Sequence, residues 1–307
     1  MTSRSTFASL FLASSLVIAL AGCADITTED PGLAVPAQTP ETSPAGVAFE
    51  AGISALEERF DARVGVTVID TGNGRPLEYR GDERFGYAST LKALAAAIVL
   101  RDTTADERDE KLRWTAADVE ASGYSPVTSE HIDDGLTVAE LAEAAVRTSD
   151  NTALNLLLDY LGGPAELDVA LNEIGDDTIS VVNTEPALNT LTPGSDDDTT
   201  TPSAYANDLH SILGGESLEQ ADIDTLLEWM GGNATGDALI RASAPEGWVV
   251  ADKSGGAGGI RNDVAVVAAP GREPIIMVIF TERNDPDADY DDALVAGVAE
   301  VAFEAVQ

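Results

Sequence analysis

The stretch Ser-Thr-Leu-Lys-Ala-Leu-Ala-Ala-Ala-Ile-Val-Leu at residues 89–100 joins a polar start to an unbroken apolar run. Its composition predicts a helix over 91–100 that is apolar on every side and therefore buried. Positions three apart share one face of a helix, so Ser89 and Lys92 are expected to meet. A serine hydroxyl is a weak nucleophile that needs a base within hydrogen-bond reach, and burial would make the neutral amine of Lys92 accessible.

Two further short motifs follow in order, Ser149-Asp-Asn151 and Lys253-Ser-Gly255. The chain contains only three lysines, and two of them, Lys92 and Lys253, lie in these motifs. Each motif has an ordinary alternative when taken alone: a surface helix, a helix cap, or the end of a strand. Taken together, they occupy a helix start, a junction between helices and a strand end, where convergent polar groups would be expected.

Apolar periodicity places the motifs in a simple order of elements. The pattern predicts an α+β fold in which one antiparallel sheet is assembled from both chain ends and flanked by helices. An all-helical lobe is inserted between them, and a cleft is expected between the two lobes. The predicted helices are 49–60, 91–100, 137–147, 152–161 and 291–305, and the five predicted strands are 63–70, 76–80, 248–252, 263–269 and 274–280.

The charge balance is extreme, with 17 basic and 54 acidic residues and a formal net charge of −37. Nucleic acids and anionic membrane surfaces would repel such a chain, so neither is expected as a binding partner. The excess is spread along the sequence, which predicts a solvated acidic surface. The same composition is found in salt-adapted proteins, and the sequence does not separate the two explanations.

Cysteine and histidine are too scarce for several kinds of site. The single cysteine, Cys23, excludes an intrachain disulfide and a cysteine nucleophile in the folded domain. Only His131 and His210 could serve a Ser-His-Asp triad, and no chemical motif surrounds either. With only two histidines, a multi-histidine metal cage is not expected. We expect neither a metal nor an organic cofactor.

The N-terminal sequence has the features of a targeting segment. Arg4 precedes an apolar run over 7–20 that is too short to span a membrane, and Leu20-Ala-Gly-Cys23 resembles a bacterial lipobox. The resemblance implies cleavage before Cys23 and lipidation of that residue; the alternative is an ordinary signal peptide. The expected organisation is a signal peptide (1–22), a flexible tether (23–47) and one domain (48–307), outside the cytoplasm and anchored by lipid. Within the domain, 48–82 and 236–307 form the sheet lobe and 83–235 the helical lobe.

From about Phe49 onward the chain resembles the class A β-lactamases, whose motif set includes the three motifs above. The resemblance extends to several other stretches. They are Tyr124-Ser-Pro126, Ser149-Asp-Asn-Thr-Ala-Leu-Asn155, Leu161-Gly-Gly-Pro164, Glu185-Pro-Ala-Leu-Asn189, Asp198-Thr-Thr-Thr-Pro202 and Arg261-Asn-Asp263. This family implies a β-lactamase/transpeptidase-like fold, a monomer, and hydrolysis of β-lactam antibiotics.

The resemblance also implies roles for individual residues. Ser89 would attack the lactam carbonyl, and either Lys92 or Glu185 through a water would be the base. Glu185 and Asn189 would hold the hydrolytic water. Ser149 would relay a proton to the lactam nitrogen, and the backbone N–H groups of Ser89 and Gly256 would form the oxyanion hole. The implied substrate-binding residues are Tyr124, Asn151, Lys253, Ser254, Gly255, Gly256 and Arg261.

Glu185 separates this function from its alternatives. A penicillin-binding DD-peptidase or esterase relative would lack the Glu-Pro-x-Leu-Asn loop, and a non-catalytic envelope lipoprotein would need none of these groups.

One departure from the family concerns the same loop. Asn183 stands where members often have an arginine paired with the aspartate that matches Asp198. We therefore expect the loop over 183–198 to be less rigidly anchored. The family also implies that the Glu185–Pro186 peptide bond is cis.

Overall fold

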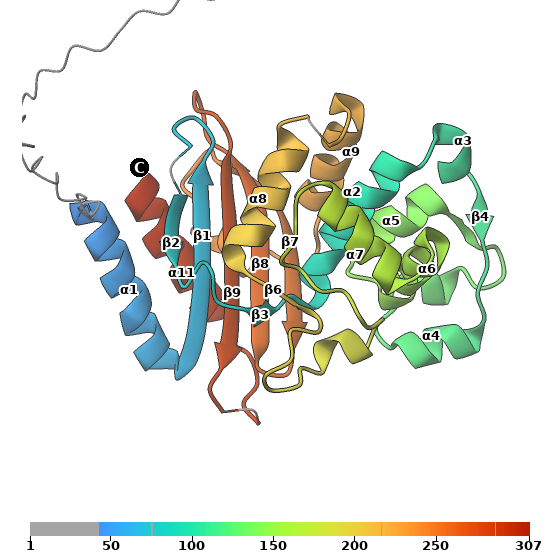
Figure 1. Cartoon of the computed structure of the whole chain (residues 1–307), viewed down its shortest axis with the longest axis horizontal. Helices are drawn as coiled ribbons and strands as arrows, with labels where there is room; N and C mark the ends of the chain where they lie inside the picture. Colours follow the sequence, from blue (N-terminus) through green and yellow to red (C-terminus); the bar gives the residue numbers. More distant parts are fainter. Residues whose placement is uncertain (1–42, 75, 216, 286) are drawn as a thin grey trace, which may run out of the picture. The chain divides into compact units, whose positions relative to one another are not determined.

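The computed structural model describes residues 43–74, 76–215, 217–285 and 287–307 (Figure 1). The predicted signal peptide, the lipobox with Cys23, and the tether as far as residue 42 lie outside the described residues.

A five-stranded antiparallel sheet joins the two ends of the folded chain. The strand order is β2-β1-β9-β8-β7, so the first strand of the chain, β1, lies against the last, β9. Val64, Val66 and Val68 on β1 are buried on one face, as their alternation predicts. The strands are β1 (Ala62–Asp70), β2 (Pro76–Tyr79), β7 (Val249–Ala257), β8 (Ile260–Ala268) and β9 (Ile275–Arg283).

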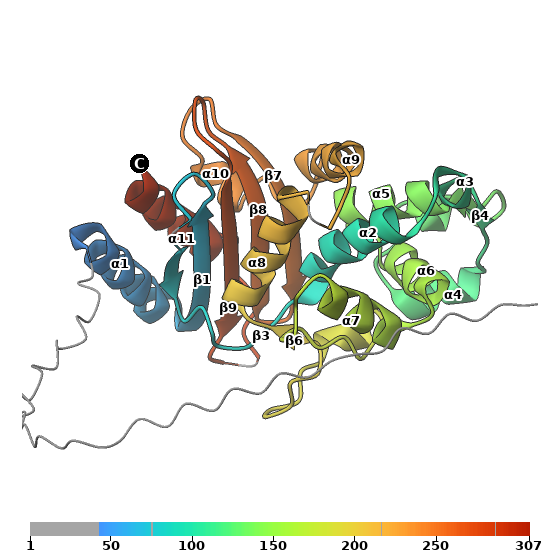
Figure 2. The same cartoon turned by 45° about the horizontal axis from the view of Figure 1, so that its top comes forward.

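Helices cover both faces of this sheet. Helices α1 (Pro44–Phe60) and α11 (Asp292–Val306) pack together on one face, and α8 (Pro202–Leu213) packs on the other, as Figures 1 and 2 show. Helix α1 begins five residues before the predicted start at 49, because Ser43 accepts a hydrogen bond from the Gly46 N–H and Pro44 occupies the first turn.

The inserted lobe is built around α2 (Leu91–Asp102). Every residue from Leu91 to Leu100 is buried, including Lys92, which confirms the prediction from the apolar run. The lobe also contains two pairs of two-residue strands that the sequence did not indicate, β3 (Phe85–Gly86) with β6 (Thr199–Thr200) and β4 (Lys111–Leu112) with β5 (Leu136–Thr137). The remaining helices are α3 (Ala105–Arg108), α4 (Ala116–Ser122), α5 (Val138–Arg147), α6 (Asn151–Leu161), α7 (Pro164–Glu173), α9 (Gln220–Gly231) and α10 (Ile240–Ser243).

One motif lies differently from its prediction. Lys253-Ser-Gly255 was expected at the end of a strand over 248–252, but β7 continues to Ala257 and contains it. The prediction was wrong because glycine weakens the strand signal, whereas pairing with β8 extends the strand through Gly255 and Gly256. The motif therefore sits in a rigid ladder that faces the helical lobe.

Candidate active site

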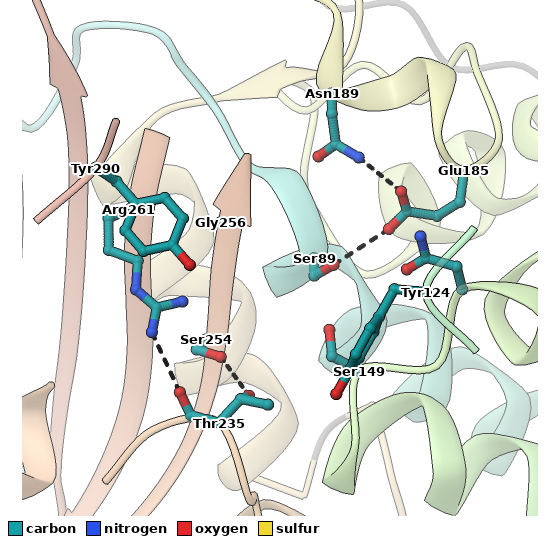
Figure 3. A pocket seen from close by; sticks show the side chains of 11 residues that line it. Ser89, Tyr124, Ser149, Glu185, Asn189, Thr235, Ser254, Gly256, Arg261 and Tyr290 are labelled. Carbon is teal, nitrogen blue, oxygen red and sulfur yellow. Dashed lines mark hydrogen bonds between the residues drawn. The ribbon is translucent and has the colours of Figure 1, made fainter. Parts of the chain in front are cut away.

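A cavity of about 430 Å³ opens between β7 and the helical lobe (Figure 3). Residues from both lobes line it, so the predicted cleft is present. The lining residues on the helical side are Ser89, Tyr124, Ser149, Asn151, Glu185 and Asn189, and those on the sheet side are Thr235, Ser254, Gly256, Arg261 and Tyr290.

Ser89 lies in a short 3-10 helix (Ala88–Thr90) that leads directly into α2. Ala88, immediately before it, has a φ of 47°, a strained conformation for a residue with a side chain. Lys92 is on the first turn of α2, and its Nζ donates to Ser89 Oγ over 2.7 Å. The serine and lysine therefore meet as the i, i+3 spacing predicts.

Lys92 Nζ is surrounded by oxygen acceptors. It lies 2.9 Å from Glu185 Oε1, 2.6 Å from Asn151 Oδ1 and 2.9 Å from the Ser149 carbonyl. Complete burial lowers the pKa of Lys92, and the nearby Glu185 carboxylate opposes that shift. Ser89 Oγ in turn donates to Glu185 Oε1 over 3.1 Å. The serine proton is thus within one hydrogen bond of both candidate bases.

The second motif is held by its central aspartate. Asp150 is fully buried, caps α6 through the Ala153 N–H, and accepts the backbone N–H groups of Val127 and Thr128. Ser149 has a φ of 58°, so its side chain is directed by a strained backbone. The helix cap that was the alternative explanation of this motif is therefore present, formed by Asp150. The same motif also places the Ser149 hydroxyl in the cleft.

The loop that carries Glu185 is tied to α6 by Asn155. The Asn155 side chain accepts the Glu185 N–H over 2.8 Å and donates to the Glu185 carbonyl over 2.9 Å. The Glu185–Pro186 peptide bond is cis, as predicted. Asn189 Nδ2 donates to Glu185 Oε2 over 2.6 Å, and Asn189 Oδ1 is buried without a partner among the described residues.

Asp198 anchors the other end of this loop without an arginine. Its carboxylate accepts the Asn183 amide over 2.6 Å, the Tyr87 hydroxyl over 2.8 Å, and the backbone N–H groups of Val182 and Asn183. Burial and the neighbouring Asp198 charge raise the pKa of Tyr87, which keeps its hydroxyl a donor. Hydrogen bonds thus take the place of the missing ion pair, and whether they leave the loop softer stays a prediction.

Lys253 reaches the cleft from the sheet side. Its fully buried Nζ donates to Ser149 Oγ over 3.1 Å and to the Ser254 carbonyl over 2.6 Å. Burial, and secondarily the Lys92 charge, lower the pKa of Lys253 well below its usual value. Ser149 Oγ also lies 3.3 Å from Lys92 Nζ, so this hydroxyl connects the two lysines.

The glycines after Lys253 allow a close approach. A Cβ on Gly255 would stand 3.0 Å from the Tyr87 carbonyl, and one on Gly256 would stand 3.1 Å from Arg261 Nη1. Figure 3 shows Gly256 on the strand beside the short helix that carries Ser89. Arg261 is paired with Asp292 over 2.6 Å, and its guanidinium lies 4.8 Å from the ring centre of Tyr290.

The structure brings most of the predicted site residues to one cavity and places Lys92, Lys253 and Gly255 directly behind its wall. Sequence reasoning missed Thr235 and Tyr290. Thr235 follows α9, and Tyr290 precedes α11, so each lies in a connecting segment without a motif. Only the fold brings these two segments to the cleft.

Two searches of the described residues gave negative results. No group of three or more His, Cys, Asp or Glu side chains there could hold a metal ion. Of the helices in those same ranges, none is long and apolar enough to cross a membrane.

Comparison with known proteins identifies a family to which this chain is similar. A sequence model described as the β-lactamase enzyme family matches residues 48–306. A β-lactamase of Bacillus amyloliquefaciens is 48% identical over 250 residues, 81% of each chain. One from Amycolatopsis lactamdurans is 45% identical over 268 residues, 87% of this chain and 88% of the relative.

Solved structures agree with the sequence relatives. The class A β-lactamase from Clostridium kluyveri DSM 555 superposes with a TM-score of 0.82 at 40% identity, over 85% of this chain and 99% of that one. A halotolerant bacterial β-lactamase superposes with a TM-score of 0.80 at 43% identity, over 83% of this chain and 98% of that one.

Proposed function

The chain belongs to the class A serine β-lactamases and hydrolyses β-lactam antibiotics, and from this premise we propose how its own residues perform the reaction. The observation that carries the proposal is the position of Ser89 Oγ. It lies 2.7 Å from Lys92 Nζ and 3.1 Å from Glu185 Oε1. The nucleophile is therefore in hydrogen-bond contact with both groups proposed to accept its proton.

In acylation, Ser89 Oγ forms a bond to the lactam carbonyl carbon and gives up its proton to the Lys92–Glu185 pair. The buried Lys92 has a lowered pKa, whereas Glu185 is reached directly, and both routes remain open. The carbonyl oxygen would gain charge opposite the N–H groups of Ser89 and Gly256. The carbon–nitrogen bond then breaks, and Ser149 passes a proton to the nitrogen, resupplied through its contacts with the two lysines.

In deacylation, a water binds beside Glu185 and Asn189, whose side chains are hydrogen-bonded directly to each other. Glu185 Oε2 and Asn189 Nδ2 are 2.6 Å apart, and the unpartnered Asn189 Oδ1 supplies an acceptor for that water. Glu185 removes one water proton as the new carbon–oxygen bond forms, and the bond to Ser89 Oγ breaks with return of a proton to Ser89. The penicilloic or cephalosporoic acid product then leaves.

Substrate binding divides between the two sides of the cleft. Lys253, Ser254 and Arg261 would receive the carboxylate that penicillins and cephalosporins carry, with Gly255 and Gly256 keeping this part of β7 free of side chains. Asn151 would bind the side-chain amide, and Tyr124, which is 59% exposed, would cover the opening. We expect a monomer that needs no cofactor.

β-Lactamases of this family are typically extracytoplasmic. For this chain we propose lipidation at Cys23 and a tether over 23–47 that holds the domain, residues 48–307, near the membrane. Replacing Cys23 by Ser should release the enzyme from the membrane fraction without changing its turnover, whereas unchanged membrane association would contradict the anchor.

The mechanism is tested by a time course with a chromogenic cephalosporin. We expect turnover many times the enzyme concentration and, for Glu185→Gln, a burst of one equivalent followed by a slow phase. Catalysis sustained by Glu185→Gln at the native rate would overturn the assigned role of Glu185. A one-equivalent burst from the unaltered protein would instead indicate the behaviour of a penicillin-binding DD-peptidase, and no burst would indicate a non-catalytic lipoprotein.

A further inference from the structure

A chain of polar groups, buried except for the half-buried Thr235, ends at the proposed carboxylate site, and only its last member, Ser254, has a role in the proposed function. It runs from Asp252 through Asn233 and Thr235 to Ser254. The contacts are Asn233 Nδ2 to Asp252 Oδ2 at 2.7 Å, Thr235 Oγ1 to Asn233 Oδ1 at 2.7 Å, and Thr235 Oγ1 to Ser254 Oγ at 2.5 Å. Figure 3 shows the last of these contacts at the sheet side of the cavity.

The packing around this chain is tight. Asn233 and Ser254 are each 2% exposed, and Asp252 is fully buried. Arg241 pairs with Asp252 at the inner end. A Cβ on Gly236 would stand 1.7 Å from Asp252 Oδ2, so the close approach of this segment requires glycine.

The direction of every hydrogen bond in the chain follows from one backbone group. The Thr235 N–H donates to Asn233 Oδ1 over 3.1 Å, which fixes the side-chain amide with its oxygen toward Thr235 and its NH₂ toward Asp252. The contact between Thr235 Oγ1 and Asn233 Oδ1 needs a proton, and only the threonine hydroxyl carries one. The single hydroxyl proton of Thr235 is therefore already donated to Asn233, so Ser254 must be the donor in its contact with Thr235.

We infer that Asn233 and Thr235 are positioning residues that set the direction of the Ser254 hydroxyl, and that two hydroxyls turn together when substrate binds. In the free enzyme Ser254 donates to Thr235 and presents only lone pairs to the cleft. In the complex Ser254 donates to the substrate carboxylate, and Thr235 turns from Asn233 to donate to Ser254 Oγ. Asn233 Oδ1 keeps the Thr235 N–H throughout. This inference rests on the proposed function, because it takes Ser254 as a carboxylate ligand.

The count of hydrogen bonds shows why this change is favourable. Each state has two bonds donated by the two hydroxyls, so the reversal loses none. One of the two becomes charge-assisted in the complex, and such bonds are roughly twice as strong as neutral ones. A neutral group in place of the carboxylate would gain no such advantage, so the relay favours anionic substrates.

The test measures binding of intact benzylpenicillin in a Ser89→Ala background, where no acyl-enzyme forms. Four variants are compared by calorimetry: Thr235→Val, Thr235→Ser, Ser254→Ala and the Thr235→Val/Ser254→Ala double variant. We expect Thr235→Val to strengthen binding roughly threefold to tenfold, the size of one neutral hydrogen bond, because it removes two hydroxyl hydrogen bonds from the free enzyme and only one from the complex. Thr235→Ser keeps the hydroxyl and should restore native binding. Once Ser254 is alanine, Thr235→Val should have no further effect.

The outcomes separate two kinds of failure. If Ser254→Ala leaves binding unchanged, the carboxylate role of Ser254 in the proposed function is wrong, and the relay falls with it. If Ser254→Ala weakens binding but Thr235→Val acts equally in both backgrounds, or Thr235→Ser behaves as Thr235→Val does, the relay alone is overturned. Melting temperatures of all variants identify any that fail to fold.

Neutron diffraction from the deuterated Ser89→Ala protein would locate the hydroxyl protons directly. We expect the Ser254 deuterium to point toward Thr235 in the free protein and toward the carboxylate with benzylpenicillin bound. A Ser254 deuterium already directed into the empty cleft would overturn the inference even if every variant folded poorly.

Discussion

The two sides of the cleft are built in different ways. On the helical side, Lys92 contacts Ser89, Ser149 and Glu185 directly, and Ser89 also donates to Glu185. Each of these contacts bears on a proton that moves in the proposed reaction. On the sheet side, Ser254 and Arg261 face the cavity, but each is already paired with a neighbour, Thr235 or Asp292.

This difference suggests that the helical side contributes mainly to turnover and the sheet side mainly to substrate affinity. Groups that exchange protons must be preorganised, so their contacts should contribute mainly to turnover. Groups that receive a charged substrate must release or share an existing partner, so their contacts should contribute mainly to affinity. Variants on the helical side should therefore change rates, and variants on the sheet side should change binding.

The strongest test of the helical side is Glu185→Gln. Loss of a general base typically costs about 10²–10⁴-fold, and here the loss should fall on deacylation, because Glu185 and Asn189 together hold the proposed water. Rapid-quench mass spectrometry should find the enzyme acylated in the steady state. Asn189→Asp is the matched variant at the other water contact. A substitution of Glu185 that slowed acylation and deacylation equally would favour Glu185 over Lys92 as the base for both steps.

The loop anchor offers the next largest effect. Asp198→Asn removes a buried charge that accepts four hydrogen bonds, and hydrogen bonds to charged groups contribute about 1.5–3 kcal/mol each. We expect a lower melting temperature and faster hydrogen exchange over 183–198, with deacylation slowed more than acylation. The exposed neighbour Asp197, changed to Asn, is the control for charge alone.

The same measurement decides the prediction drawn from Asn183. Replacing Asn183 by Arg would add an ion pair to Asp198, and slower exchange in that variant would show that the native loop is softer. Exchange over 183–198 that already matches the core helices in the native protein would contradict the prediction.

A pH experiment tests whether the two sides are electrically coupled. Lys253 must be charged to attract a carboxylate, so binding should weaken as pH rises through its lowered pKa. The Lys92 charge lowers the pKa of Lys253, and the Glu185 charge raises it. In the Ser89→Ala background, Lys92→Met should therefore move the alkaline loss of benzylpenicillin binding to higher pH. Glu185→Gln should move it to lower pH. No shift in either variant would show that the two sides titrate independently, and shifts in the same direction would contradict the opposite effects assigned to Lys92 and Glu185.

The fold and the helical side of the site could largely be predicted from the sequence. The unbroken apolar run specifies α2, the alternation of apolar residues specifies β1, and the spacing of Ser89 and Lys92 brings these two residues together within one turn. Asp150 is recognisable as a helix cap. These features are local in the chain, so a pattern in a few residues is sufficient to indicate them.

The sheet side could be predicted only in part. Thr235 and Tyr290 reach the cleft because α9 and α11 end and begin beside β7 and β8, and no spacing in the sequence encodes that proximity. The extension of β7 past Gly255 likewise depends on pairing with β8. The two small strand pairs in the inserted lobe escaped detection because two residues cannot show an alternation.

The smallest predicted effect concerns the partner of Arg261. Asp292 holds the guanidinium over 2.6 Å and competes with a substrate carboxylate for the same donors. Asp292→Asn should lower KM for benzylpenicillin by roughly threefold while leaving kcat nearly unchanged, since half-exposed ion pairs contribute about 0.2–1 kcal/mol. Asp291→Asn makes the same charge change one residue away, where the side chain caps α11 through the Ala293 N–H instead. Equal effects in the two variants would assign the change to overall charge. A change in kcat rather than KM for Asp292→Asn would show that the sheet side, too, contributes to turnover.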